Sequence, residues 1–199
     1  TPVCPQAARA ALTMMTDQFG NPSSLHSLGA AAEQEMKKAR ERVAALIGCR
    51  SDTLVFTSGG TEANNLALFG AAQAKQRTGR HIVTSAMEHP SVAEACAELE
   101  RQGFDITRLL PDASGQITPE QVASACRTDT VLVSLMTVNN EVGTRFALES
   151  LIPAIRRAAP QALIHSDAVQ AAGKLPLNVE RLDVDLLSLS AHKLHGPKG

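Results

Sequence analysis

The sequence has no tryptophan and no tyrosine, and aromatic residues make up only 3% of its 199 positions. This scarcity rules out the aromatic platforms on which many proteins stack single-stranded nucleic acid. An excess of one charge is also missing, because 19 Lys and Arg residues balance 20 Asp and Glu residues and leave a formal net charge of −1. Such a balance gives no electrostatic footprint for nucleic acid or for an anionic membrane. We therefore expect a small or neutral partner.

Long apolar runs are absent as well. No stretch reaches the length of about 18 consecutive apolar residues that a membrane-spanning helix needs. The first residues lack the charged and then apolar pattern of a signal peptide, so we expect a cytoplasmic protein. The length, together with 44% hydrophobic residues, is typical of a soluble globular protein with one sizeable core or a domain and a half.

Cysteine is sparse and scattered. The four cysteines form no C-x-x-C pair and have no histidine at ligand spacing, so we expect no metal site. Cys96 and Cys126 each share a helical face with small or aliphatic residues, which predicts that both act as small buried hydrophobes. The other two cysteines are Cys4 and Cys49.

What the sequence does contain is an alternation of helical and strand patterns. The N-terminal part predicts a short helix near residues 6–16 and a long amphipathic helix from about 26 to 47, with Gly48 as its C-terminal cap. Strands are then predicted at 53–57, 81–85, 104–110, 130–138, 162–165 and 184–189, with helices between them. The continuous apolar run 130–138 is typical of a strand covered by helices on both faces, so we place it at the sheet centre. The pattern predicts an α/β, three-layer domain with a mainly parallel central sheet flanked by helices.

A glycine turn joins the first predicted strand to the following helix. Ser58-Gly-Gly-Thr61 lies between them, and Thr61 can cap the helix. The glycines allow backbone N–H groups to approach an anion, and the helix dipole favours negative charge there. An ordinary tight connection between a strand and a helix would look the same, so both interpretations stay open.

Polar residues follow the ends of several predicted strands, and in parallel sheets ligands bind at that edge. They are Gly59-Gly60-Thr61, Glu88-His89, Asn139-Asn140, Asp167 with Gln170, and Ser190 with His192-Lys193. Each has a plain structural alternative: His89 as a structural hydrogen-bonding residue, Asp167 as a helix N-cap, Lys193 as a solvated surface charge. Ser91 can cap the helix after His89.

Taken together, these residues fit pyridoxal phosphate. This cofactor needs an amine, a carboxylate to keep its pyridine nitrogen protonated, donors for the ring oxygen, an aromatic cover and an anion cradle. Lys193 is the candidate amine, because desolvation and neighbouring cations activate a lysine as a Schiff-base nucleophile. Asp167 is the candidate carboxylate.

Six ordered segments carry a resemblance to a known family. They are GNPSSLHSLG (20–29), FTSGGTEANN (56–65), MEHPSV (87–92), VNNEVGT (138–144), HSDAVQAAGK (165–174) and SLSAHKLHGPKG (188–199). On these segments the chain resembles the cysteine desulfurases of the NifS/IscS-like class, within the aspartate-aminotransferase fold family of pyridoxal phosphate enzymes (fold type I). The resemblance covers essentially the whole chain.

The resemblance implies a role for each site residue. Lys193 would form the internal aldimine, Asp167 would pair with the pyridine nitrogen, and Gln170 would hydrogen-bond the ring oxygen. His89 would stack on the ring and assist proton transfers, and Asn140 would lie beside the ring oxygen and the substrate. The phosphate would be held by Gly60, Thr61, Ser190 and His192.

The resemblance also implies a reaction and partners. L-Cysteine would be converted to L-alanine while a cysteine thiolate of the enzyme takes the sulfur as a persulfide, for transfer to a sulfur-acceptor or scaffold protein in iron–sulfur cluster assembly or thiolation. Full-length relatives are expected to be homodimers.

Departures from the family pattern bear on the domains. The family's D-x-x-A-T strand would precede residue 1, and Ala191 stands where glycine is frequent. We expect residues 1–15 to belong with the small domain and residues 16–199 to form the large cofactor-binding domain, incomplete at its C-terminus. None of the four cysteines lies in a segment like the catalytic-cysteine loop, so the chain alone should be catalytically incomplete.

Other functions stay open. One is a different pyridoxal phosphate reaction on the same fold, such as selenocysteine lyase or transamination. Another is a non-catalytic fragment that acts as an interaction module. A nucleotide-dependent dehydrogenase is disfavoured because the sequence has no G-x-G-x-x-G turn.

Overall fold

A five-stranded parallel sheet forms the centre of the protein. The computed structural model describes residues 1–198, and the strand order is β2-β1-β3-β4-β5, with every neighbouring pair parallel. The strands are β1 (His81–Ser85), β2 (Asp105–Leu109), β3 (Thr130–Ser134), β4 (Leu163–Asp167) and β5 (Leu186–Ser188). The predicted fold class is therefore confirmed, with β3 at the centre as the sequence indicated.

The central strand is shorter than the apolar run that encodes it. Beyond Ser134, the backbone N–H groups of Leu135 and Thr137 still donate to the carbonyls of His165 and Asp167 beside them. The N–H of Met136, by contrast, donates to the carboxylate of Glu88 at 2.9 Å. The ladder with β1 ends here because a side chain replaces the neighbouring backbone as acceptor.

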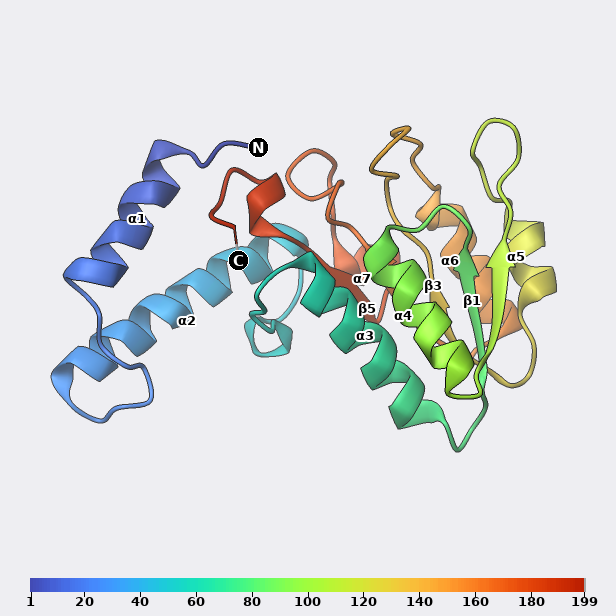
Figure 1. Ribbon diagram of the computed structural model, residues 1–199, viewed down its shortest axis with the longest axis horizontal. Coiled ribbons are helices and arrows are strands. Elements are labelled where there is room, and N and C mark those ends of the chain that lie inside the picture. The colour runs from blue at the N-terminus through green and yellow to red at the C-terminus, as the bar shows by residue number, and fades with distance from the viewer. Residues whose placement is uncertain (199) are drawn as a thin grey trace.

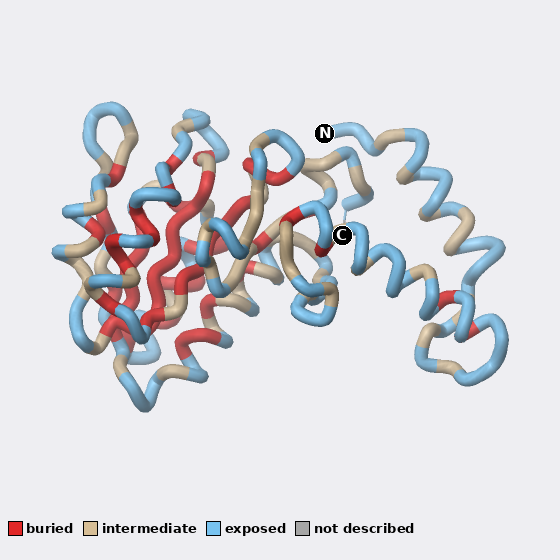
Figure 2. The backbone as a smooth tube through the Cα atoms, turned by 180° about the vertical axis from the view of Figure 1, so that it is seen from behind, coloured by how far each residue is buried: buried red, intermediate tan, exposed pale blue. Residues whose placement is uncertain are grey.

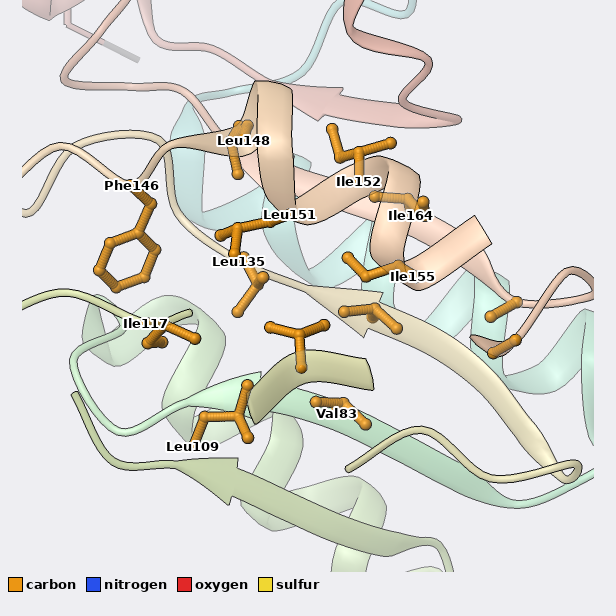
Figure 3. Packing of buried hydrophobic residues seen from close by; sticks show 14 of the residues in the cluster. Val83, Leu109, Ile117, Leu135, Phe146, Leu148, Leu151, Ile152, Ile155 and Ile164 are labelled. Carbon is orange, nitrogen blue, oxygen red and sulfur yellow. The ribbon is translucent and has the colours of Figure 1, made fainter. Parts of the chain in front are cut away.

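Helices cover both faces of the sheet (Figure 1). One face carries α3 (Gly60–Lys75) and α4 (Pro90–Arg101), and the other carries α5 (Pro119–Ala125) and α6 (Leu148–Ala158). Successive strand residues point to opposite faces, so Ile82 packs in the cluster with α3 and α4 while Val83 packs in the cluster with α5 and α6. Figure 3 shows Val83 and Leu109 lying across from Leu151 and Ile155 of α6. Thr118 starts α5 with the predicted capping box.

Two buried histidines cross-link the strands. His165 of β4 lies 2.9 Å from the hydroxyls of Ser134 on β3 and Ser188 on β5. His81 similarly bridges the hydroxyls of Thr130 and Thr107. Burial lowers the pKa of His165 to about 3, so the ring is neutral and can donate to one hydroxyl and accept from the other.

The N-terminal helices extend away from the sheet (Figure 1). They are α1 (Pro5–Thr16) and α2 (Ser27–Ile47), and α2 ends at Gly48 with φ 67, the cap that the sequence predicted. Figure 2 shows mostly exposed or half-buried backbone along both helices. The apolar stripe of α2 is only partly covered, since Leu28 and Leu46 remain exposed.

The predicted strand 53–57 is wrong. Residues 51–53 form the short 3₁₀ helix η1 (Ser51–Thr53), and residues 54–57 belong to no strand ladder. Val55 and Phe56 are exposed, and no strand pairs with them among residues 1–198. The Arg40 guanidinium of α2 instead lies 4.8 Å from the centre of the Phe56 ring and donates to the Leu54 carbonyl. A β-branched and aromatic run becomes a strand only where a partner supplies hydrogen bonds.

Two predicted helix caps are wrong as well. Gly59 rather than Thr61 is the N-cap of α3, with no side-chain cap bond. His89 rather than Ser91 caps α4, because the His89 Nδ1 atom accepts the backbone N–H of Ser91 at 3.1 Å.

The remaining elements are the short helix α7 (Val179–Leu182) and the 3₁₀ helix η2 (Ala191–Lys193). Within residues 1–198, no helix has the length and apolar character needed to cross a membrane.

The core side of α6 supplies a stability prediction. Leu151 is 0% exposed, so Leu151→Ala should lower the free energy of unfolding by about 3 kcal/mol through lost burial and a residual cavity. Urea denaturation measures the change. Leu110→Ala is the matched control, because Leu110 is 73% exposed and its truncation should cost at most about 0.5 kcal/mol. Equal losses in the two variants would contradict this packing.

Candidate functional site

A cavity of about 310 Å³ opens beyond the carboxyl ends of the strands, within the range of small-molecule sites. Its lining residues come from α3, the start of α4, the end of β4, the loops after β1, β3 and β4, and η2: Gly60, Thr61, Asn64, His89, Ser91, Met136, Val138, Asn140, Asp167, Val169, Gln170, His192 and Lys193. Every site residue predicted from the sequence is in this set except Ser190. Segments separated by more than a hundred positions therefore meet at one sheet edge.

The glycine turn forms one wall of the cavity. Gly59 adopts φ 155, a conformation that is essentially restricted to glycine. A Cβ atom at Gly60 would lie 3.0 Å from Val169 Cγ2 and 3.6 Å from Ser190 Cβ, so a side chain would crowd the site. No group among residues 1–198 accepts the N–H of Gly60 or Thr61. The first turn of α3 thus offers free donors to an anion.

Ser190 borders this wall although it does not line the cavity. It is buried, and its hydroxyl lies 2.7 Å from His192 Nδ1. Burial and, secondarily, the positive charge of Lys193 lower the pKa of His192. The hydroxyl of Ser190, the imidazole of His192 and the N-terminus of α3 thus lie close together, at the place where the sequence predicted a phosphate cradle.

The Asp167 carboxylate lies at the end of β4 and is only 6% exposed. Its Oδ1 accepts the backbone N–H of Val169 at 2.9 Å, and its Oδ2 accepts the Asn64 side-chain amide at 2.7 Å. Within the described part of the chain, no Lys, Arg or His forms an ion pair with it. A buried carboxylate with only neutral donors leaves room for a protonated ligand nitrogen in the cavity.

His89 stands at the corner between β1 and α4. Its Nδ1 accepts the Ser91 backbone N–H and lies 2.8 Å from the Ser91 hydroxyl. The structural interpretation of this residue is confirmed, because the ring caps α4, and the same ring also lines the cavity.

Lys193 closes the site from η2. It lines the cavity, and no acidic side chain pairs with its ammonium group among residues 1–198. Gln170 lines the same cavity, and its Oε1 accepts Lys174 Nζ at 3.4 Å. Asn140 lines the cavity from an exposed position after β3.

Glu88 lies behind the cavity, and sequence reasoning gave it no role. Its Oε1 accepts the Ser85 hydroxyl at 2.7 Å and the Met136 N–H at 2.9 Å, whereas its Oε2 has no hydrogen-bond partner. Burial, with a smaller contribution from the negative charge of Asp167, raises the pKa of Glu88 to about 8. The side chain is therefore mostly a neutral acid at pH 7.

Two further residues of the site were missed by sequence reasoning, namely Asn64 and Ser91. Asn64 follows Gly60 by one helical turn, so helical spacing could have placed both on the cavity side of α3. Ser91 was considered only as a cap. Nothing in the sequence indicates that the two side chains touch.

A larger cavity of about 530 Å³ lies between residues 53–57 and β5. Its lining is mainly aliphatic, and its ionisable residues are Cys49 and Asp185. It lacks the converging polar groups of the smaller cavity, which is therefore the better candidate for catalysis. Among residues 1–198, no group of three potential metal ligands comes together.

Comparison with known proteins gives consistent matches over the whole chain. The Aminotransferase class-V family model matches residues 1–199. The chain is 44% identical over 199 residues to cysteine desulfurase IscS of Dictyoglomus turgidum, covering 100% of this chain and 50% of that protein. It is 47% identical over an alignment of 202 residues to cysteine desulfurase IscS of Shewanella woodyi, with the same coverage. The chain thus spans about half the length of the curated relatives it matches.

Solved structures agree. A structure described as a NifS-like protein superposes with a TM-score of 0.97 at 37% identity, covering 100% of this chain and 55% of its own. Another, described as SspA in complex with cysteine, has a TM-score of 0.95 at 39% identity and is covered to 57%. These similarities confirm the fold and the family resemblance.

The protonation of Glu88 generates a pH prediction. Between the ordinary carboxyl pKa of 4.5 and about 8, the folded chain holds a proton that the unfolded chain has lost. The free energy of unfolding therefore falls as the pH rises, by about 1.4 kcal/mol per unit from this group. Glu88→Gln removes the slope, so the variant should gain about 2 kcal/mol relative to the parent chain between pH 6 and pH 8.

Urea denaturation at both pH values measures the difference. Glu94→Gln is the matched control, because Glu94 is exposed on α4 and its variant should follow the parent chain at both pH values. Parallel pH dependence of Glu88→Gln and the parent chain would show that Glu88 is ionised in the folded state.

Proposed function

The chain belongs to the Aminotransferase class-V family, and from this premise we propose that it forms the pyridoxal phosphate-binding part of a cysteine desulfurase. The observation that carries the proposal is the cavity at the sheet edge, which gathers Lys193, Asp167 and His89 beside the glycine turn of α3. We further propose that residues 16–199 form the large cofactor-binding domain and that residues 1–15 belong with a small domain.

The anion cradle fits a phosphate group. The N–H groups of Gly60 and Thr61 start a helix of 16 residues, whose dipole favours a dianion at that end. Ser190 adds a hydroxyl beside Gly60, and its neighbour His192 adds an imidazole. The contact that a Cβ at Gly60 would make with Val169 explains why the turn is built from glycine.

The remaining lining fits the pyridine ring. Asp167 would hold a proton on the ring nitrogen, because both of its oxygens are already oriented by neutral donors. Gln170 would bond the ring oxygen, and His89 would cover the ring face. Lys193 supplies the amine that would hold the cofactor covalently. When bound, pyridoxal phosphate supplies a carbonyl carbon for amines and a ring that withdraws electrons from the substrate.

The side chains of the site account for substrate handling. With L-cysteine as the substrate, the Nζ atom of Lys193 would accept a proton from it and return that proton. His89 would face the same substrate, and Asn140 would bond it from the exposed rim of the cavity. The description of SspA as a complex with cysteine supports this substrate class.

The sulfur step needs a thiolate that this cavity does not contain. None of the four cysteines lines it, and burial raises the pKa of Cys96 to about 12 and of Cys126 to about 11. A thiol with so high a pKa is a poor nucleophile at neutral pH. We propose that the persulfide forms on a cysteine other than these four, in a homodimer that passes sulfur to an acceptor or scaffold protein.

The cofactor assignment predicts a specific loss. The chain mixed with pyridoxal phosphate should develop a visible absorption band, and borohydride should fix the cofactor to Lys193, as located by peptide mass spectrometry. Lys193→Ala should lose both signals because the amine is gone. Lys198→Ala, five residues away and exposed, is the matched control and should keep them. Undiminished labelling of the Lys193→Ala variant would refute the assignment.

The sulfur step predicts an incomplete reaction. The 199-residue chain loaded with pyridoxal phosphate and given L-cysteine should form no persulfide on its own cysteines, as read by alkylation and mass spectrometry. Alanine should not accumulate with repeated turnover. Sustained turnover without another polypeptide would contradict the proposal, and activity confined to selenocysteine or to a keto acid would favour a related pyridoxal phosphate reaction.

A further inference from the structure

Asn64 lines the cavity and joins two of the other site residues. It lies on α3, is 1% exposed, and its side-chain amide donates to both Asp167 Oδ2 at 2.7 Å and Ser91 Oγ at 2.9 Å. A carboxylate can only accept hydrogen bonds, so the contact with Asp167 fixes which end of the Asn64 amide faces it. Both amide hydrogens are thereby used.

The chain of hydrogen bonds continues to the imidazole. His89 Nδ1 accepts the Ser91 backbone N–H at 3.1 Å, so this nitrogen carries no hydrogen of its own. The Ser91 hydroxyl, 2.8 Å away, must therefore donate to Nδ1 while its oxygen accepts from Asn64. With two donors on Nδ1, the hydrogen of the neutral ring must lie on Nε2, and no group among residues 1–198 accepts it.

We propose that Asn64 is a positioning residue that couples the Asp167 carboxylate to the His89 imidazole through the Ser91 hydroxyl, so that His89 presents an Nε2 hydrogen to the bound cofactor and substrate. The coupling deepens the proposed function, on which its catalytic meaning rests, but the hydrogen bonds themselves exist without any ligand. Asn64 would hold the group that faces the ring nitrogen and the group that covers the ring as one unit.

The orphaned acceptor of Asn64 supports this role. Its Oδ1 is buried and has no hydrogen-bond partner. A buried amide oxygen without a partner costs stability, and a leucine of similar size would avoid that cost. The two hydrogen bonds that the amide nitrogen donates, to Asp167 and to Ser91, offset this cost and explain why an asparagine stands here.

Three substitutions separate the links. Asn64→Asp replaces the double donor by an acceptor, so the Ser91 hydroxyl should turn toward residue 64 and leave His89 Nδ1. Asn64→Leu removes the donor to Asp167, but leaves the Ser91 hydroxyl free to keep its bond to Nδ1. Ser91→Ala removes that bond alone. If Asn64 served only to fill space, the three substitutions would not differ in this way in their effect on the hydrogen bond at His89 Nδ1.

Nitrogen-15 NMR of the histidine side chains in the cofactor-free chain reads the outcome. The His89 Nδ1 resonance should move toward the value of a free acceptor in Asn64→Asp and Ser91→Ala, and should stay near the parent value in Asn64→Leu. Asn65→Asp is the matched control, because it makes the same change one position along the helix, outside this network, and should leave Nδ1 unmoved. An unmoved Nδ1 resonance in folded Asn64→Asp would overturn the coupling.

A second measurement decides the matter should the buried aspartate prevent folding. In chains that retain Asn64, its two amide hydrogens have separate NMR resonances. Ser91→Ala should shift one and Asp167→Asn mainly the other, and a lack of response to both would overturn the proposal.

Cofactor binding tests the role of Asn64 toward the ligand. The Asn64→Leu variant should bind pyridoxal phosphate about tenfold more weakly than the parent chain, because Asp167 loses a hydrogen bond to its charged carboxylate. Equal binding by Asn64→Leu and the parent chain would overturn the role toward the cofactor, and failure of all variants and the parent to bind would instead count against the proposed function.

Discussion

The burial of one carboxylate, Asp167, without a cationic partner determines the electrostatics of the site. An isolated buried charge is costly unless donors surround it, and here a backbone N–H and the Asn64 amide supply them. A second negative charge close by would be less tolerable still. Burial raises the pKa of Glu88 to about 8, and the negative charge of Asp167 contributes a smaller part in the same direction. The chain thus keeps one buried charge facing the cavity and neutralises the other.

Parallel strands make this arrangement possible. Because all strands point the same way, the loops after β1, β3 and β4 emerge at one edge, where the N-terminus of α3 also lies. The helices on the two faces are held by apolar clusters, and within the sheet the neutral rings of His81 and His165 bond hydroxyls on both sides. The site therefore rests on a rigid base, while its polar groups are presented by the loops and helix ends.

Much of this could be predicted from the sequence, because periodicity and strand-end chemistry are local signals. The alternation of patterns gave the layers, and the polar residues after the strands indicated the cavity lining. Pairing, however, depends on what lies alongside: the run at 53–57 has strand-forming residues but no neighbouring strand among the described residues. The caps of α3 and α4 differed because the geometry at Gly59 and His89 competed with the better-known capping residues. The contact of Asn64 with Ser91 and Asp167 joins positions 27 and 103 residues apart, which no local pattern encodes.

The distribution of unsatisfied polar groups separates the parts of the molecule that provide stability from those that provide chemistry. Deep in the sheet, the hydroxyl and imidazole groups of the histidine cross-links are fully paired, as burial demands. The buried side-chain atoms without partners in the described chain belong to Asn64, Glu88 and Thr84. Asn64 lines the cavity and Glu88 binds its wall at Met136, so two of the three exceptions adjoin the site. Natural sequences break local rules of satisfaction mainly where a side chain serves a purpose other than stability. The exceptions thus point to the same sheet edge as the strand-end residues do, by an independent physical criterion.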